Sequence, residues 1–293
     1  MLQHGSEHRA GFSAVTREPP LLWETKDGPP DGSPRVTTFG LCIFASSSAG
    51  NCSAMIFGEG RLRRVALLDC GLSPRKTRIA LSTLGLGLEH IDDVLLTHLD
   101  QDHFHPGWIK ALPPHARFRL HERHRGRAKR DGVLARRTLI FDAPFELSSG
   151  ARVTPLLLDH DSLGVAAFRV DQAGETSGSL GFATDLGRVT PPLVSMMSGV
   201  GVLAIESNYC PDMQLASDRP EFLKRRIMDG SGHLSNEECR DAVRAINPAR
   251  DVVLLHLSRQ CNTPDRAASF HTGAPYRVTV ARHDGPTGVI PVA

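Results

Sequence analysis

From about residue 36 onward, short apolar runs alternate with turn-forming residues. This pattern predicts β-strands, because runs of this length bounded by Gly, Pro, Asn, Asp or Ser are typical of buried strands. Several runs carry few polar residues, which is typical of strands buried on both faces of a sheet. The predicted strands span residues 36–44, 52–57, 65–69, 91–96, 153–161, 165–170, 180–184, 202–206, 252–255 and 276–281.

Helix signals lie between several of these strands. Ser73 is a predicted N-cap followed by Pro74 at the first helical position, and Gly85 is placed to end that helix. Residues 212–230 have a polar helical pattern, Ser235-Asn236-Glu237-Glu238 forms a capping box before a helix that stops at Asn247-Pro248, and Thr263-Pro264-Asp265 begins a last helix. Strands mixed with helices in this order predict an α/β (α+β) fold class.

Residues 1–35 differ from the rest of the chain. Pro19-Pro20, Gly28-Pro29-Pro30 and Asp31-Gly32-Ser33-Pro34 interrupt any regular element there. We therefore expect a flexible N-terminal extension over residues 1–35 and one catalytic domain over residues 36–293.

A residue of the kind that binds metals follows the apolar run of six predicted strands. One such residue would carry little meaning, but six indicate that several strand ends converge on one polar pocket. These residues are Asp69, His98, His160, Asp185, Glu206 and His256.

Potential metal ligands are most closely spaced in the stretch Thr97-His98-Leu99-Asp100-Gln101-Asp102-His103. It places four potential ligands within six residues, directly after the apolar run Val94-Leu95-Leu96. Packing does not explain two His and two Asp at this spacing, so a metal site is favoured over a solvated polar turn.

The composition indicates the class of protein and the compartment in which we expect it. The chain has 293 residues, a formal net charge of +2 and 40% hydrophobic residues, which is typical of a globular protein. There is neither an apolar run long enough to span a membrane nor the apolar core of a signal peptide. The six cysteines contain no Cys-x-x-Cys pair, so we expect free thiols and a cytoplasmic location.

Residues 115–137 are strongly basic, with nine Lys or Arg against Glu122 and Asp131. Such a segment can follow a phosphate backbone, or it can be a solvated helix face or loop. The sequence leaves both interpretations open.

The ligand-type residues resemble, in order and spacing, the motif of the metallo-β-lactamase superfamily: His-x-His-x-Asp-His after a strand, then a single His, Asp and His. The matching positions are His98, Asp100, Asp102, His103, His160, Asp185 and His256. A finer resemblance is to a bacterial branch of single-domain DNA exonuclease-like phosphodiesterases. It rests on residues 46–51, Leu68-Asp69-Cys70-Gly71, Glu206-Ser207-Asn208-Tyr209, residues 232–236 and His256-Leu257-Ser258. The implied fold is a four-layer αββα sandwich with metals at one edge.

The resemblance implies two divalent metal ions, Zn²⁺ or Mn²⁺, with Fe also possible. The first would take His98, Asp100 and His160, the second Asp102, His103 and His256, and Asp185 would bridge. Asp100 departs from the family, which has His there, and a carboxylate shifts the preference from Zn²⁺ toward Mn²⁺ or Fe.

The same resemblance implies hydrolysis by a metal-bridging hydroxide, with Asp102 and His233 as catalytic residues. His233 would assist the leaving oxygen, and Asp69 would support the ligand loop by hydrogen bonding. The predicted substrate-binding residues are Ser47, Ser48, Asn51, Asn208 and His233. For residues 47–51 a plain turn is an equal alternative.

Three functions follow from this sequence. The first is a metal-dependent phosphodiesterase, a nuclease acting on DNA. The second is a small-molecule hydrolase of the same fold, acting on a thioester, a lactone or a cyclic phosphodiester. The third is a non-catalytic metal-binding protein, because Asp100 could spoil one site. Fold alone does not decide among them.

Overall fold

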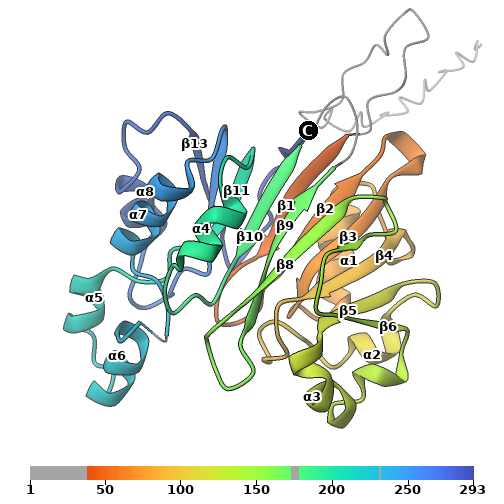
Figure 1. The fold of residues 1–293 in the computed structure, drawn as a ribbon, viewed down its shortest axis with the longest axis horizontal. Coiled ribbons are helices and arrows are strands. Elements are labelled where there is room, and N and C mark those ends of the chain that lie inside the picture. Colours follow the sequence, from red (N-terminus) through yellow and green to blue (C-terminus); the bar gives the residue numbers. More distant parts are fainter. Residues whose placement is uncertain (1–37, 173–177, 231) are drawn as a thin grey trace, which may run out of the picture.

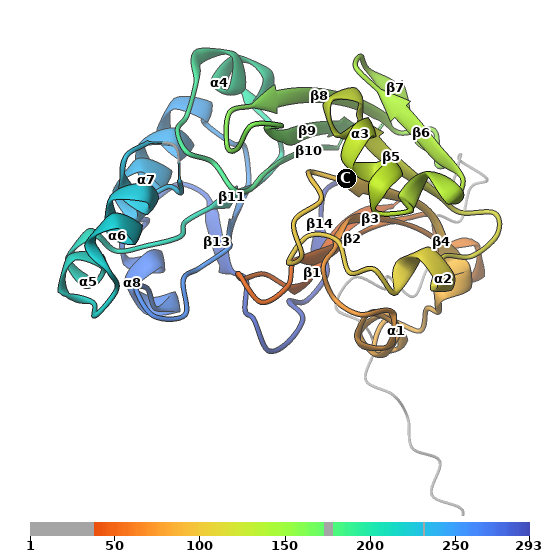
Figure 2. The same ribbon diagram turned by 90° about the horizontal axis from the view of Figure 1, so that it is seen from below.

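The computed structural model describes residues 38–172, 178–230 and 232–293. The predicted extension over residues 1–35 lies outside this part of the chain. Within it, the strands form two seven-stranded sheets with helices on their outer sides (Figure 1). Turned by 90°, α1 and α2 lie beside one sheet and α4, α7 and α8 beside the other (Figure 2). The predicted four-layer αββα sandwich is therefore confirmed.

The first sheet has the strand order β14-β1-β2-β3-β4-β5-β6. Its strands β3, β4, β5 and the edge strand β6 are parallel to one another, whereas β1, β2 and β14 are antiparallel to their neighbours. The strands are β1 (Phe39–Ala45), β2 (Cys52–Phe57), β3 (Arg64–Cys70), β4 (Ile91–Leu96), β5 (Arg117–His121), β6 (Thr138–Phe141) and β14 (Ile290–Pro291).

The second sheet has the order β13-β12-β11-β10-β9-β8-β7, with β10 to β13 parallel to one another. Parallel neighbours place their carboxyl ends at the same edge of the sheet. The strands are β7 (Phe145–Glu146), β8 (Arg152–Leu158), β9 (Val165–Asp171), β10 (Ser179–Ala183), β11 (Val202–Glu206), β12 (Asp251–Leu255) and β13 (Arg277–Val280).

The helices cover the outer faces of the sheets. Those that follow strands of the first sheet are α1 (Pro74–Ser82), α2 (Trp108–Ala111) and α3 (Arg125–Arg130). The remaining helices are α4 (Pro191–Met197), α5 (Pro211–Ala216), α6 (Glu221–Met228), α7 (Asn236–Ile246) and α8 (Pro264–Ser269). No helix in the described ranges has the length and hydropathy needed to cross a bilayer.

The core lies between the two sheets. Leu41 and Leu68 of the first sheet pack in one buried cluster with Phe168 and Val253 of the second. A second cluster lies between the first sheet and its helices, and a third lies between the second sheet and its helices. Each central strand is thus buried on both faces, which explains its nearly continuous apolar sequence.

The predicted N-caps at Ser73 and Ser235 are confirmed. The Ser73 hydroxyl accepts a hydrogen bond from the backbone N–H of Lys76. In the capping box, the Ser235 hydroxyl accepts from the Glu238 N–H, and the Glu238 carboxylate accepts from the Ser235 N–H. These bonds satisfy N–H groups that a helix start leaves without partners.

Two predictions were wrong in detail. Residues 212–230 do not form one helix, because Pro220 separates α5 from α6. For residues 115–137, the alternative of a solvated helix face or loop is wrong for part of the segment, because the segment contains β5, in which Arg119 is buried against Asp93 at 2.7 Å. The strands β5, β6, β7 and β14 and the helices α2, α3 and α4 were not predicted.

Candidate metal centre

The predicted strand-end residues meet at one edge of the two sheets. Asp69 belongs to the end of β3, and His98 follows the adjacent parallel strand β4. On the second sheet, Asp185 follows β10, Glu206 ends β11 and His256 follows β12. Each of these five parallel strands therefore delivers a polar side chain to the same place.

Three of these residues have a left-handed backbone. The φ angles of Asp69, Asp185 and His256 are 57°, 53° and 56°. Residues other than glycine rarely adopt this conformation, although Asp, Asn and His do so more often than most. Asp69 is the second-last residue of β3, and Asp185 and His256 follow β10 and β12 closely, so this backbone conformation occurs where the strands end. The surrounding buried contacts offset its conformational cost.

A buried hydrogen-bond network orients His103. The carboxylate of Asp69 accepts a hydrogen bond from His103 Nδ1 at 2.7 Å and another from the Thr97 backbone N–H at 2.8 Å. The Thr97 hydroxyl also bonds to this carboxylate. Because Nδ1 donates to Asp69, Nε2 is the nitrogen that faces the site. Burial alone would lower the pKa of His103, but Asp185 and Asp69 raise it well above its usual range, so Nε2 would give up its proton when a metal ion binds there. This is the supporting arrangement expected for Asp69.

Asp185 lies at the centre of the site. Its Oδ2 lies 2.6 Å from His103 Nε2 and 3.5 Å from His98 Nε2, while its Oδ1 lies 2.8 Å from His256 Nδ1. Burial alone would raise the pKa of Asp185, but His256 and His103 outweigh it and hold this pKa well below its usual range. Asp185 is therefore a carboxylate placed between two groups of histidines.

The donor atoms form compact groups on either side of Asp185. In each group the ligand atoms lie within 4.8 Å of one another. The groups include His98 with Asp100 and His160, and Asp102 with His103 and His256. These are the two predicted ligand sets.

The donor chemistry fits divalent metal ions. His160 Nδ1 and His256 Nε2 are buried and have no hydrogen-bond partner among the described residues. Burial, together with the nearby His103, lowers the pKa of His98 well below its usual range, so its imidazole is neutral and can donate a lone pair. Buried imidazoles with free nitrogens beside carboxylates are the donors that Zn²⁺, Mn²⁺ and Fe use.

The family profile described as "Beta-lactamase superfamily domain" matches residues 63–257. This chain belongs to the metallo-β-lactamase superfamily. Exodeoxyribonuclease WalJ of Streptococcus pneumoniae is 26% identical over 235 residues, which cover 78% of this chain and 85% of that protein. Exodeoxyribonuclease YycJ of Bacillus anthracis is 25% identical over 234 residues, covering 77% and 84%.

Solved structures show the same fold. YhfI from Bacillus subtilis has a TM-score of 0.63 at 15% identity, over 85% of this chain and 99% of its own. Zn²⁺-bound PqqB from Methylobacterium extorquens has a TM-score of 0.62 at 17% identity, over the same shares. At these identities the likeness concerns the metallo-β-lactamase fold.

Asp100, the departure from the superfamily motif, has a cationic partner. Arg127 Nη1 donates to Asp100 Oδ1 at 2.6 Å, and Arg127 Nη2 donates to the Leu99 carbonyl at 2.7 Å. Asp100 Oδ2 lies 3.7 Å from His98 Nε2. The guanidinium thus fixes one oxygen and offsets the extra negative charge, while the other oxygen faces the ligand group. The sequence shows no link between these residues, since they are far apart in the chain.

Glu206 connects His233 to the ligand set. Its buried Oε1 lies 2.7 Å from His233 Nδ1 and 2.9 Å from His256 Nδ1, and its Oε2 accepts from the Leu186 N–H. Burial alone would raise the pKa of Glu206, but His233 and His256 hold it below its usual range. Glu206 therefore lies beneath the site as an anion that positions both rings. In the sequence, Glu206 was recognisable as a candidate site residue because it stands at the end of a predicted strand.

The predicted substrate-binding residues divide into two groups. Ser48 and Asn208 line the cleft above the ligands. Ser47 and Asn51 are instead buried in the turn, where the Asn51 side chain bonds to the Ser47 backbone and lies 2.9 Å from His103 Nε2. For these two residues the geometry favours the turn alternative, with Asn51 bracing the ligand loop.

The cleft has a volume of about 450 Å³. One wall contains His98, Asp100, Asp102, His160, Asp185 and His256, with His233 beside them. The segment containing α5 and α6 adds Arg219 and Arg226, which were not predicted as site residues. Figure 1 shows these two helices at one end of the molecule, beyond α4 and α7.

Proposed function

We propose that this protein is a metal-dependent phosphodiesterase that degrades DNA as an exonuclease. The proposal is carried by the likeness to two exodeoxyribonucleases across more than three quarters of the chain. The site geometry supports it, because the ligand set and His233 share one open cleft.

The seven ligand residues have distinct tasks. His98, Asp100 and His160 would hold one ion, Asp102, His103 and His256 would hold the other, and Asp185 would contact both. When bound, such ions activate water and neutralise charge on phosphoryl oxygens. Since Asp100 adds a hard oxygen donor at one site, we propose Mn²⁺ or Zn²⁺ as the native metal, with Fe as a further candidate.

His233 is the proposed proton donor to the leaving oxygen. Glu206 accepts its Nδ1–H, so the ring is fixed and Nε2 remains available to the substrate. The side chain is 23% exposed, whereas Glu206 is fully buried. Asp102 is proposed to act from the ligand side, where its Oδ2 lies 3.5 Å from both His103 Nε2 and His256 Nε2.

An assay on end-labelled DNA tests the proposal. The purified protein is freed of metal, reloaded with Mn²⁺ or Zn²⁺, and incubated with single- and double-stranded oligonucleotides, a thioester and bis-p-nitrophenyl phosphate. We expect metal-dependent release of nucleotides that is lost in Asp102→Ala and falls at least about a hundredfold in His233→Ala. Glu59→Ala is the control, because Glu59 is exposed in the turn before β3 and lies outside the ligand set. Thioester turnover without DNA degradation would overturn the proposal.

A further inference from the structure

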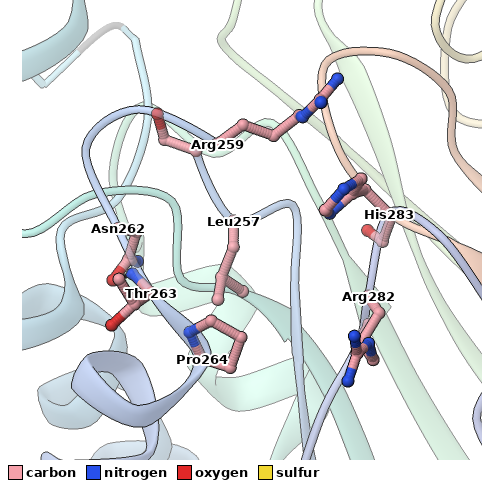
Figure 3. A pocket seen from close by; sticks show the side chains of 10 residues that line it. Leu257, Arg259, Asn262, Thr263, Pro264, Arg282 and His283 are labelled. Atoms are coloured by element: carbon pink, nitrogen blue, oxygen red, sulfur yellow. The ribbon is translucent and has the colours of Figure 1, made fainter.

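A second hollow lies beside the metal cleft. Its volume is about 390 Å³, and Ser258 lines both hollows, so the two are adjacent. Figure 3 shows Arg259 extending along its rim from one side, with Arg282 and His283 on the segment opposite. Its wall also includes Ser46, whose hydroxyl accepts the His256 backbone N–H at 2.8 Å. The hollow therefore continues directly from the ligand cluster.

Arg219 lies where the two hollows meet. Its Nη2 donates to the Ser258 hydroxyl at 3.2 Å, and its Nε and Nη1 donate to the side-chain oxygens of Gln260 and Gln214, each at 3.0 Å. All three acceptors are neutral, and no carboxylate pairs with Arg219 in the described part of the chain. A guanidinium has five N–H donors, so two remain for a ligand in a fixed orientation.

Arg259 extends the positive charge into the second hollow. It follows Ser258 in the chain, so its backbone is one residue from the atom that Arg219 contacts. Its side chain is exposed and forms neither an ion pair nor a hydrogen bond within the described ranges. Arg282 differs, because Asp284 pairs with it at 3.0 Å. Arg219 and Arg259 are thus the cations here whose charge is not offset.

The basic segment predicted from the sequence does not offer an equivalent pair near the ligands. Arg119 is buried against Asp93, and Arg127 is committed to Asp100. The acidic side chains of the cleft are those that would hold the metal ions, so bound ions offset their charge. Arg219 and Arg226 line the metal cleft and Arg259 lines the second hollow, and Arg219 and Arg259 are the two beside Ser258, where the hollows meet.

We propose that Arg219 and Arg259 bind phosphates of the DNA strand that flank the scissile one, and that the strand runs from the metal cleft past Ser258 into the second hollow. This inference rests on the proposed nuclease function. A phosphate is the ligand of choice, because a guanidinium fork matches its oxygens and both hollows are open to solvent. This phosphate-binding track, formed by Arg219 and Arg259, would select a polynucleotide over a small phosphodiester that has no flanking phosphate.

Matched variants test this track. Arg219→Gln and Arg259→Gln each remove one charge, and Arg61→Gln is the control, because Arg61 is exposed in the turn before β3, at the opposite end of that strand from Asp69. KM is measured with metal-loaded protein for a single-stranded oligonucleotide and for bis-p-nitrophenyl phosphate at several salt concentrations. Arg219→Lys keeps the charge but loses the fork.

We expect each Gln variant to raise KM for the oligonucleotide about tenfold relative to KM for the small diester. The slope of log affinity against log salt should fall by about 0.7 per arginine. Arg219→Lys should keep the slope while raising KM. If the wild type degrades DNA and both Gln variants match Arg61→Gln, the track is wrong and the nuclease function stands. If the wild type degrades no DNA, the nuclease function itself fails.

Discussion

Replacing Asp69 by Asn tests how the end of β3, in the first sheet, prepares His103 for metal binding. The Asp69 carboxylate accepts hydrogen bonds from His103 Nδ1 at 2.7 Å and from the Thr97 N–H at 2.8 Å. An amide has only one acceptor oxygen. If that oxygen stays on Thr97, the amide NH₂ faces His103 Nδ1, and the proton of the ring moves to Nε2. Nε2 is the atom that lies 2.6 Å from Asp185, so the ligand lone pair is lost.

The size of the effect follows from this single hydrogen bond. Loss of a carboxylate that orients a ligand histidine lowers metal affinity by about 10- to 100-fold, which corresponds to about 1.4–2.7 kcal/mol. Zn²⁺ and Mn²⁺ affinities are measured by competition with a chromophoric chelator, and folding is checked by chemical denaturation. Asp92→Asn is the control, because Asp92 pairs with Arg64 near the start of β4, away from the site. Wild-type metal affinity in Asp69→Asn would refute the reasoning.

Three further predictions concern the ligand loop, the residue Asp100 that differs from the superfamily motif, and the start of α7. A Cβ on Gly71 would overlap the Asp102 carbonyl oxygen, so Gly71→Ala should lower the free energy of unfolding by about 1–3 kcal/mol and reduce metal content, as denaturation and elemental analysis would show. Asp100→His should raise Zn²⁺ affinity in competition titrations, and more so together with Arg127→Gln, because a retained guanidinium would repel the ion held by His98 and His160. Unchanged Zn²⁺ affinity in both variants would count against Asp100 as a ligand. Ser235→Ala should cost about 1 kcal/mol in denaturation, since it removes the hydroxyl that caps α7, and a cost near zero would contradict the cap.

The ligand positions were predictable because they follow from local rules. A strand hidden between two layers is almost wholly apolar, so a His or Asp directly after it stands out. Parallel strands then bring these ends together, as Asp185 and His256 show at the ends of β10 and β12. The two caps at Ser73 and Ser235 were predictable for the same reason, since each depends on residues within one turn.

The partners of the ligands were not predictable, because they depend on contacts between distant segments. Arg127 reaches Asp100 only after α3 has packed beside the ligand loop. The burial of Arg119 within the basic segment was not predictable, because it depends on Asp93 of the neighbouring strand. In the same way, Arg219 gains its place in the cleft from contacts with Ser258, which lies on another segment. A charged residue cannot be assigned to core or surface without its counterpart.

Anomalous diffraction from crystals grown with Mn²⁺ tests the central claim most directly. We predict two peaks on either side of the Asp185 carboxylate, one contacted by His98, Asp100 and His160, the other by Asp102, His103 and His256. In Asp185→Asn crystals at least one peak should weaken. A single peak that excludes His160 and Asp100, or peaks away from this cluster, would contradict the two-metal account.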